Sequence, residues 1–148
     1  MRVVPSWNDY FANLAVEVAT RSKDPSTQVG AIITNKQHDI LATGYNGFPP
    51  GCEDSARLWE RPIKYDRVIH AELNAIARAA KLGHSLDDGI IYTTAFPCLS
   101  CAKAIIAAGI SKVYAGPPLK GWDDEHKKAN GLLTEAKVKI GKANVISQ

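Results

Sequence analysis

Apolar residues recur at helical spacing near the start of the chain and predict an amphipathic helix over residues 7–22. Ser6, followed three residues later by Asp9, resembles a capping-box start. Asp24-Pro25 stops this helix, because proline disfavours the helical conformation in the residue before it. Two short β-branched runs follow, at 29–34 and 40–44, and the polar stretch between them predicts a hairpin.

Residues 45–67 carry glycines and prolines without sustained periodicity, so they predict a long loop. Loops of this length inside a compact domain are usually functional. We therefore expect this segment to build the wall of a pocket.

The remainder of the chain alternates predicted helices and strands. Helices are expected from near His70 to Gly83, from Pro97 to Gly109, and from the acidic run at 123–125, whose charges suit a helix N-terminus. Strands are expected at 90–94, 113–115 and 137–140, with Val145 and Ile146 as candidates for an extension. This order predicts an α/β fold with a mixed sheet of about five strands, covered by helices on both faces.

The length of 148 residues fits one domain, 1–148, and the hydrophobic content of 45% is that of a globular protein. No apolar run has the length of a membrane span, and Arg2 is followed within a few residues by the polar Ser6, Asn8 and Asp9 instead of a signal-peptide core. We expect a cytoplasmic protein with no membrane partner. The net charge of +3 is mild and the C-terminal lysines alternate with acidic residues, which favours a solvated face over nucleic-acid binding.

Cys98 and Cys101 form a C-x-x-C pair, which in a chain with three cysteines indicates metal or redox chemistry. The upstream His70-x-Glu72 favours a metal, because a redox dithiol has no use for it. Two thiolates and one imidazole leave tetrahedral zinc an open fourth position, whereas structural zinc sites are usually closed by four residues. We expect one catalytic zinc per chain, held by His70, Cys98 and Cys101.

Glu72 lies too close to His70 to reach the same metal comfortably, and is well placed to face the water on it. Two thiolates cancel the charge of zinc and weaken its effect on that water, so a nearby base is needed. The order H-x-E, then P-C-x-x-C, is the pattern of zinc nucleobase deaminases. Such a site suits hydrolytic deamination at an amidine carbon, as in cytosine or adenine.

Four blocks of the sequence resemble the deoxycytidylate deaminases of the cytidine deaminase superfamily: RSKDPSTQVGA at 21–31, GYNGFP at 44–49, HAELNAI at 70–76 and PCLSCAK at 97–103. The resemblance extends over residues 7–140. It implies a three-layer α/β/α fold and conversion of dCMP to dUMP with release of ammonia. It also implies activation by dCTP, with Mg²⁺ as a companion of the triphosphate, inhibition by dTTP, and a homo-oligomer, often a hexamer.

The resemblance also assigns residues. It makes His70, Cys98 and Cys101 the zinc ligands and Glu72 the proton shuttle. It implies that the backbone near Ala71 holds the cytosine and that Asn46 contacts the sugar, with Thr27, Asn74 and Lys23 as further substrate contacts. The segment Gly44-Tyr45-Asn46-Gly47 resembles the effector segment, where glycines and successive N–H groups could form an anion nest.

Several points stay open at this level. Lys23, Arg78 and Lys81 are candidates for phosphate contacts or merely solvated cations, and Trp59 and Trp122 either cover a nucleotide or serve the core. Residues 116–122 depart from the family by lacking a tyrosine, so the clasp of the 5′-phosphate is not assigned. The rival functions are a tRNA-adenosine or single-stranded-cytidine deaminase, which needs a basic, aromatic-lined groove, and a structural zinc module. The spacing of Cys52, His38, His84 and His126 does not suit a second zinc.

Overall fold

The computed structural model describes residues 1–144. Its helices are α1 (Trp7–Ala19), α2 (Ala71–Leu82), α3 (Leu99–Ala107) and α4 (Asp123–Glu135), with short 3-10 helices η1 (Ala56–Trp59) and η2 (Ile63–Asp66). Its strands are β1 (Gly30–Thr34), β2 (Ile40–Tyr45), β3 (Ile90–Thr93), β4 (Lys112–Ala115) and β5 (Lys139–Lys142). Within the described residues, no helix is both long enough and apolar enough to cross a bilayer.

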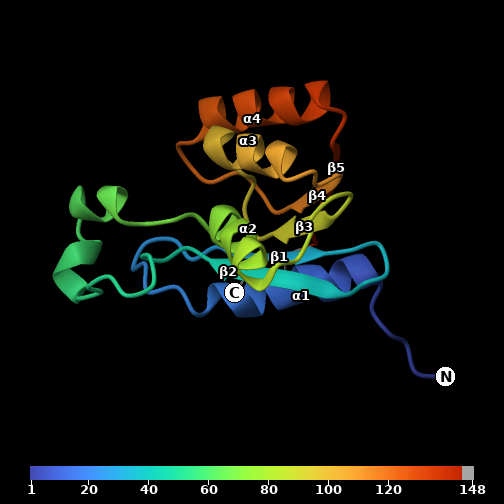
Figure 1. Cartoon of the computed structure of the whole chain (residues 1–148), viewed down its shortest axis with the longest axis horizontal. Helices are drawn as coiled ribbons and strands as arrows, with labels where there is room; N and C mark the ends of the chain where they lie inside the picture. The colour runs from blue at the N-terminus through green and yellow to red at the C-terminus, as the bar shows by residue number, and fades with distance from the viewer. Residues whose placement is uncertain (145–148) are drawn as a thin grey trace.

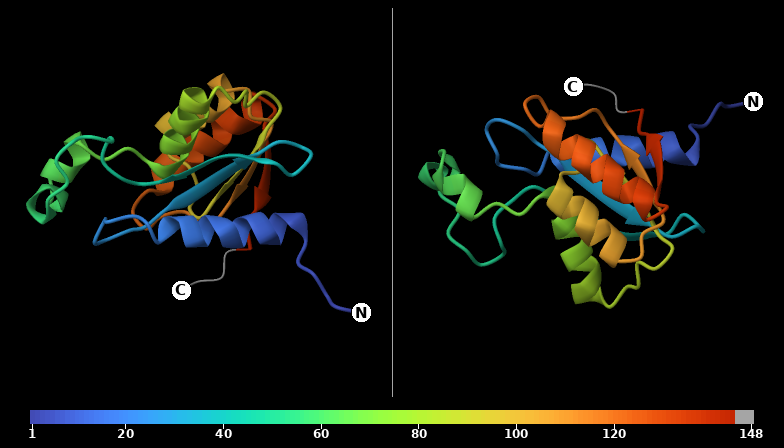
Figure 2. Two further views of the ribbon diagram at one scale, coloured as in Figure 1. Left: turned by 60° about the horizontal axis from the view of Figure 1, so that its bottom comes forward. Right: turned by 90° about the horizontal axis from the view of Figure 1, so that it is seen from above.

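The five strands form one mixed sheet in the order β2-β1-β3-β4-β5. The pairs β1/β2 and β1/β3 are antiparallel, whereas β3/β4 and β4/β5 are parallel. Helix α1 covers one face, and α2, α3 and α4 cover the other (Figures 1 and 2). The predicted three-layer α/β/α fold is therefore confirmed.

Side chains that point alternately to the two faces of the central strands build one hydrophobic core on each face of the sheet. On β1 and β3, Ile33 and Ile91 join the alanine-rich cluster under α2 and α3, while Ile32 and Tyr92 join the cluster with Phe11 of α1. Successive side chains of a strand point to opposite faces, so a strand buried on both faces is largely apolar. Every residue of β1 and β3 is in fact buried.

Predicted boundaries shift by up to three residues, and two of these shifts have a clear backbone cause. Helix α1 ends at Ala19 instead of Ser22, because the N–H groups of residues 20–22 bond to carbonyls three residues back, which tightens the last turn. Strand β5 begins two residues later than predicted, after Lys137 turns the chain with a φ of 62°. The predicted extension at Val145 and Ile146 lies outside the described residues.

Residues 45–67, predicted as a plain loop, contain η1 and η2 and project away from the sheet (Figure 1, green). An aromatic cluster holds this projection together. Phe48 stacks on Trp59 with ring centroids 4.1 Å apart, and the Arg67 guanidinium lies 5.3 Å from the Phe48 ring. The Trp59 indole N–H donates to Asp54, and its side chain is buried, so Trp59 serves packing and is not a cover for a nucleotide.

Candidate active site

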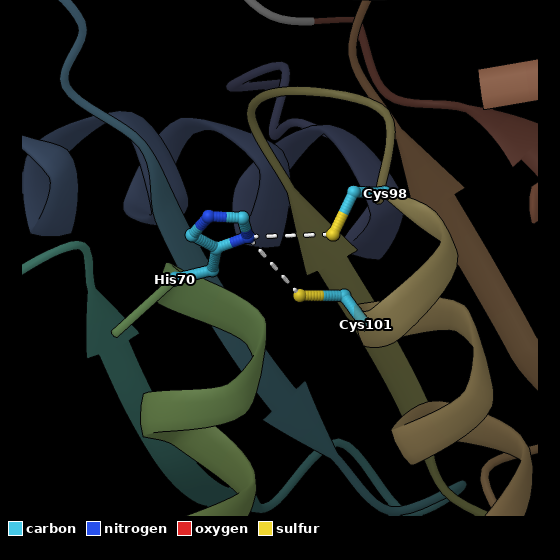
Figure 3. Close-up of side chains that lie close together, drawn as sticks. All are labelled: His70, Cys98 and Cys101. Atoms are coloured by element: carbon cyan, nitrogen blue, oxygen red, sulfur yellow. Dashed lines mark hydrogen bonds between the residues drawn. The ribbon is translucent and has the colours of Figure 1, made fainter. Parts of the chain in front are cut away.

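Two helix N-termini converge on one point, as the sequence predicts. His70 is the N-cap residue of α2 and Cys98 is the N-cap residue of α3, with Cys101 in the first turn that follows. The three side chains point toward one another (Figure 3). The His70 Nδ1 atom lies 3.4 Å from the Cys98 sulfur and 3.6 Å from the Cys101 sulfur.

These separations match the requirements of zinc. Zn–S and Zn–N bonds of about 2.3 and 2.05 Å at a tetrahedral angle place sulfur and nitrogen about 3.6 Å apart. The three ligand atoms all lie within 4.8 Å of one another, with both cysteines buried and His70 half-buried. Three protein ligands of this type fit a zinc ion and leave one coordination position for a water or a substrate atom.

The two cysteines differ in their acidity. The hydrogen bond with Cys101, and after it the one with His70, lowers the pKa of the Cys98 thiol to about 4. The same pairing with Cys98 raises the pKa of Cys101, and the hydrogen bond with Cys98 raises the pKa of His70. One thiolate is thus already favoured, and a bound zinc ion would take both sulfurs as thiolates.

Glu72 stands in the first turn of α2 beside this cluster. Its carboxyl group is almost wholly buried, and this burial raises its pKa above the ordinary value. The Thr93 hydroxyl donates to Glu72 Oε1 at 3.0 Å. A buried carboxyl with a raised pKa next to a metal site is the arrangement expected of a general acid and base.

His70, Glu72 and Cys98 all line one cavity, together with segments far away in the sequence. The projecting 45–67 segment supplies part of the wall, which confirms the pocket wall predicted for it. That segment contributes Asn46, Arg61, Lys64 and Tyr65. The remaining lining residues come from the loop after α1, from the start of α2 and the chain just before it, and from the segments around α3 and α4: Asp24, Thr27, Val29, Val68, Ala71, Ala95, Phe96, Leu119, Trp122 and His126.

An ion pair that the sequence analysis missed joins two of these walls. Lys64 on η2 donates to both carboxylate oxygens of Asp24 at 3.1 Å, and the two residues are only 5% and 6% exposed. Asp24 also accepts from the backbone N–H groups of Ser26 and Thr27. The sequence marked Asp24 only as a helix stop, and nothing in the irregular segment singled out Lys64.

The predicted substrate contacts divide into two groups. Thr27, Asn46 and Ala71 line the cavity, whereas Asn74 and Lys23 are not among its lining residues. The Asn74 amide donates to the Tyr45 carbonyl at 2.8 Å, and Lys23 pairs with Asp54 at 3.0 Å. The other two phosphate candidates, Arg78 and Lys81, are exposed on α2 and do not line the cavity either.

The side-chain amide of Asn46 hydrogen-bonds to two backbone groups of the cavity wall. Its Oδ1 accepts from the Val29 N–H at 2.8 Å, and its Nδ2 donates to the Thr27 carbonyl at 2.9 Å. These bonds hold the loop after α1 against the end of β2.

The segment Gly44-Tyr45-Asn46-Gly47 positions α2. A Cβ on Gly44 would lie 2.4 Å from both Ala71 O and Ala75 N, so glycine permits the close approach of β2 to the helix. The N–H groups of Asn46 and Gly47 donate to the carbonyls of Val29 and Ile69, so they do not form the anion nest expected there.

Two residues of helix α4, Glu125 and His126, hold the loop that carries Cys98. No sequence pattern indicated this role for either residue. Glu125, part of the acidic run expected to suit its own helix, accepts from the Leu99 N–H at the start of α3 at 3.0 Å. His126 Nε2 accepts from the Leu119 N–H at 3.1 Å, and its Nδ1 lies 3.3 Å from the Pro97 carbonyl. These two contacts assign the proton to Nδ1 and tie residues 97 and 119 together.

Comparisons with known proteins agree with this geometry. The sequence model of the cytidine and deoxycytidylate deaminase zinc-binding region matches residues 5–117. A deoxycytidylate deaminase of Homo sapiens is 45% identical over 142 residues, which cover 92% of this chain and 79% of the human one. An uncharacterized deaminase of Aliivibrio fischeri is 41% identical over 142 residues, covering 93% and 94% of the two chains.

A solved structure shows the same fold. The crystal structure of dCMP deaminase from the cyanophage S-TIM5 in complex with dCMP and dUMP superposes with a TM-score of 0.77 at 28% identity, covering 95% of this chain and 99% of that one. From the family match and these relatives together, the chain belongs to the cytidine and deoxycytidylate deaminase family.

Proposed function

We propose that this protein is a hydrolase that converts dCMP and water to dUMP and ammonia. The observation that carries the proposal is the convergence of His70, Cys98 and Cys101 beside the buried carboxyl of Glu72, with His70, Glu72 and Cys98 on the wall of one cavity. The deoxycytidylate deaminases among the relatives and the dCMP and dUMP bound to the cyanophage enzyme support this choice of substrate.

We assign the zinc site to His70, Cys98 and Cys101. When bound, zinc acts as a Lewis acid and lowers the pKa of a coordinated water. Glu72 accepts the first proton of the attacking water and delivers it to N3 of the cytosine ring. It then passes the second proton to the departing 4-amino group, so that the C4–N bond breaks and ammonia leaves while the water oxygen stays on C4.

The cavity walls suggest where the rest of the substrate lies. We propose that Thr27, Asn46 and the backbone near Ala71, which line the cavity, contact the base and the sugar. Contacts from Lys23 and Asn74 stay predictions of the family resemblance, because neither side chain lines the cavity.

For the 5′-phosphate, the cavity offers Arg61. The other permanent cation on its wall, Lys64, is neutralised by Asp24 at 3.1 Å. No carboxylate partner of Arg61 is found within residues 1–144. A guanidinium presents paired N–H donors that match phosphate oxygens, so we propose Arg61 as the phosphate contact.

The test is the loss of ultraviolet absorbance when the purified, zinc-loaded protein is given dCMP, deoxycytidine, a single-stranded oligonucleotide or tRNA. We expect turnover of dCMP and far slower turnover of deoxycytidine. Turnover of a nucleic acid without turnover of dCMP would refute the proposal in favour of a nucleic-acid deaminase. Zinc binding without turnover of any of these would favour a structural zinc module.

The family resemblance supplies further proposals. We propose activation by dCTP with Mg²⁺, inhibition by dTTP, one catalytic zinc per chain, a single domain over residues 1–148, and a homo-oligomer with a hexamer favoured. Adding each nucleotide to the dCMP assay, with and without Mg²⁺, tests the regulation. Metal analysis and light scattering test the zinc content and the oligomer, and the cytoplasmic location stays a prediction.

A further inference from the structure

Thr93 occupies a place where a strand residue has no evident need of a polar group. It is the last residue of β3, it pairs with Ala31 and Ala115 on the two neighbouring strands, and its side chain is fully buried. Valine has nearly the same shape and suits a central strand at least as well. A buried hydroxyl costs free energy unless it is hydrogen-bonded, so the bonds that Thr93 makes must account for it.

The Thr93 hydroxyl lies between two acceptors. Its Oγ1 is 3.0 Å from Glu72 Oε1 on α2 and 3.0 Å from the Ala95 carbonyl oxygen. A hydroxyl carries one proton and donates to one acceptor at a time. A hydrogen bond to an ionised carboxylate is stronger than one to a neutral carbonyl. With Glu72 ionised, the hydroxyl proton therefore points to Oε1, and the Ala95 carbonyl oxygen is the alternative acceptor.

This contact joins the flexible side chain of Glu72 to a central strand of the sheet. Glu72 has three rotatable side-chain bonds, whereas the branched Thr93 side chain has one and stands on a strand paired on both sides. Holding Oε1 restrains rotation of the carboxyl group and leaves Oε2 as the oxygen that exchanges protons. Ala95 lines the same cavity, three residues before Cys98.

We propose that Thr93 is a positioning residue for the deamination: its hydroxyl holds Oε1 of Glu72 so that the other oxygen stays aligned for proton transfer. The inference rests on the proposed function, because it takes Glu72 as the proton shuttle. Thr93 itself gains and loses no proton over the reaction, and no covalent bond to it forms or breaks.

The test compares Thr93→Val, which removes only the hydroxyl, with Thr93→Ser, which keeps it. For Thr93→Val we expect kcat for dCMP to fall about ten- to hundred-fold, the loss of one hydrogen bond to a charged group. The KM for dCMP and the zinc content should stay close to those of the wild type. Thr93→Ser should recover most of kcat, and a crystal structure of Thr93→Val should show the Glu72 carboxyl turned from its place.

Thr34→Val is the matched control. Thr34 is likewise fully buried and is the last residue of its strand, β1, and its hydroxyl has no hydrogen-bond partner within the described part of the chain. It should turn over dCMP like the wild type. If Thr93→Val does not fold, Thr93→Ala against Thr93→Ser makes the same comparison.

Three results would overturn the inference: wild-type kcat in Thr93→Val, a folded Thr93→Ser as slow as Thr93→Val, or a raised KM with unchanged kcat. An inactive wild type would instead refute the proposed function, and with it this role of Thr93. An active wild type beside an unaffected Thr93→Val would refute the role of Thr93 alone.

Discussion

Replacing Lys64 by methionine should destabilise the protein strongly, because it strands a buried carboxylate. Lys64 and Asp24 are 5% and 6% exposed, and Nζ contacts both carboxylate oxygens at 3.1 Å. Removing one partner of a buried ion pair costs about 3–5 kcal/mol. Asp24 keeps the N–H groups of Ser26 and Thr27 as donors, so we expect the lower end, about 3 kcal/mol, which lowers Tm by about 6–12 °C.

Urea unfolding of the wild type, Lys64→Met, Asp24→Asn and the double variant measures this loss as a double-mutant cycle. The double variant should lose less unfolding free energy than the two single variants lose together, since it leaves no unpaired charge. Lys23→Met is the matched control, because its ion pair with Asp54 is exposed and should contribute less than about 1 kcal/mol. A Lys64→Met loss no larger than that of Lys23→Met would refute the reasoning.

Three further predictions test the active site and the packing of the helices. Glu72→Gln should keep zinc and lose most turnover, whereas Cys98→Ala should lose zinc; metal analysis beside the dCMP assay checks both, and an active Glu72→Gln would contradict the shuttle. Arg61→Gln should raise KM for dCMP without slowing deoxycytidine, and equal effects on both would contradict a phosphate contact. Gly44→Ala should destabilise by more than about 1 kcal/mol by pushing on α2, while Gly131→Ala, in open space, should stabilise by about 0.5–1 kcal/mol in thermal unfolding.

The zinc cluster shows how much a sequence can determine through local chemistry. Cys98 and Cys101 are three residues apart at a helix start, so their sulfurs share one side of the chain whatever surrounds them. Ligand chemistry and the family pattern predict the pairing with His70, 28 residues before Cys98, and the distances of 3.4 and 3.6 Å agree with it.

The layers of the fold are also accessible from the sequence, since short β-branched runs predict the strands and apolar residues at helical spacing predict the helices. Both types of pattern are local. The irregular 45–67 segment has no period, and its two 3-10 helices depend on contacts such as Phe48 against Trp59.

The α/β layers and the predicted ligand set with its neighbouring carboxyl follow from the amino-acid sequence alone, because they depend on local patterns and on residue types at short spacing. The surroundings of these residues follow from the packing of segments that are distant in the sequence. The Asp24–Lys64 pair spans 40 residues, and the Thr93–Glu72 bond spans 21. Such contacts depend on how separate segments pack, and a lone lysine or threonine carries no pattern that announces its partner.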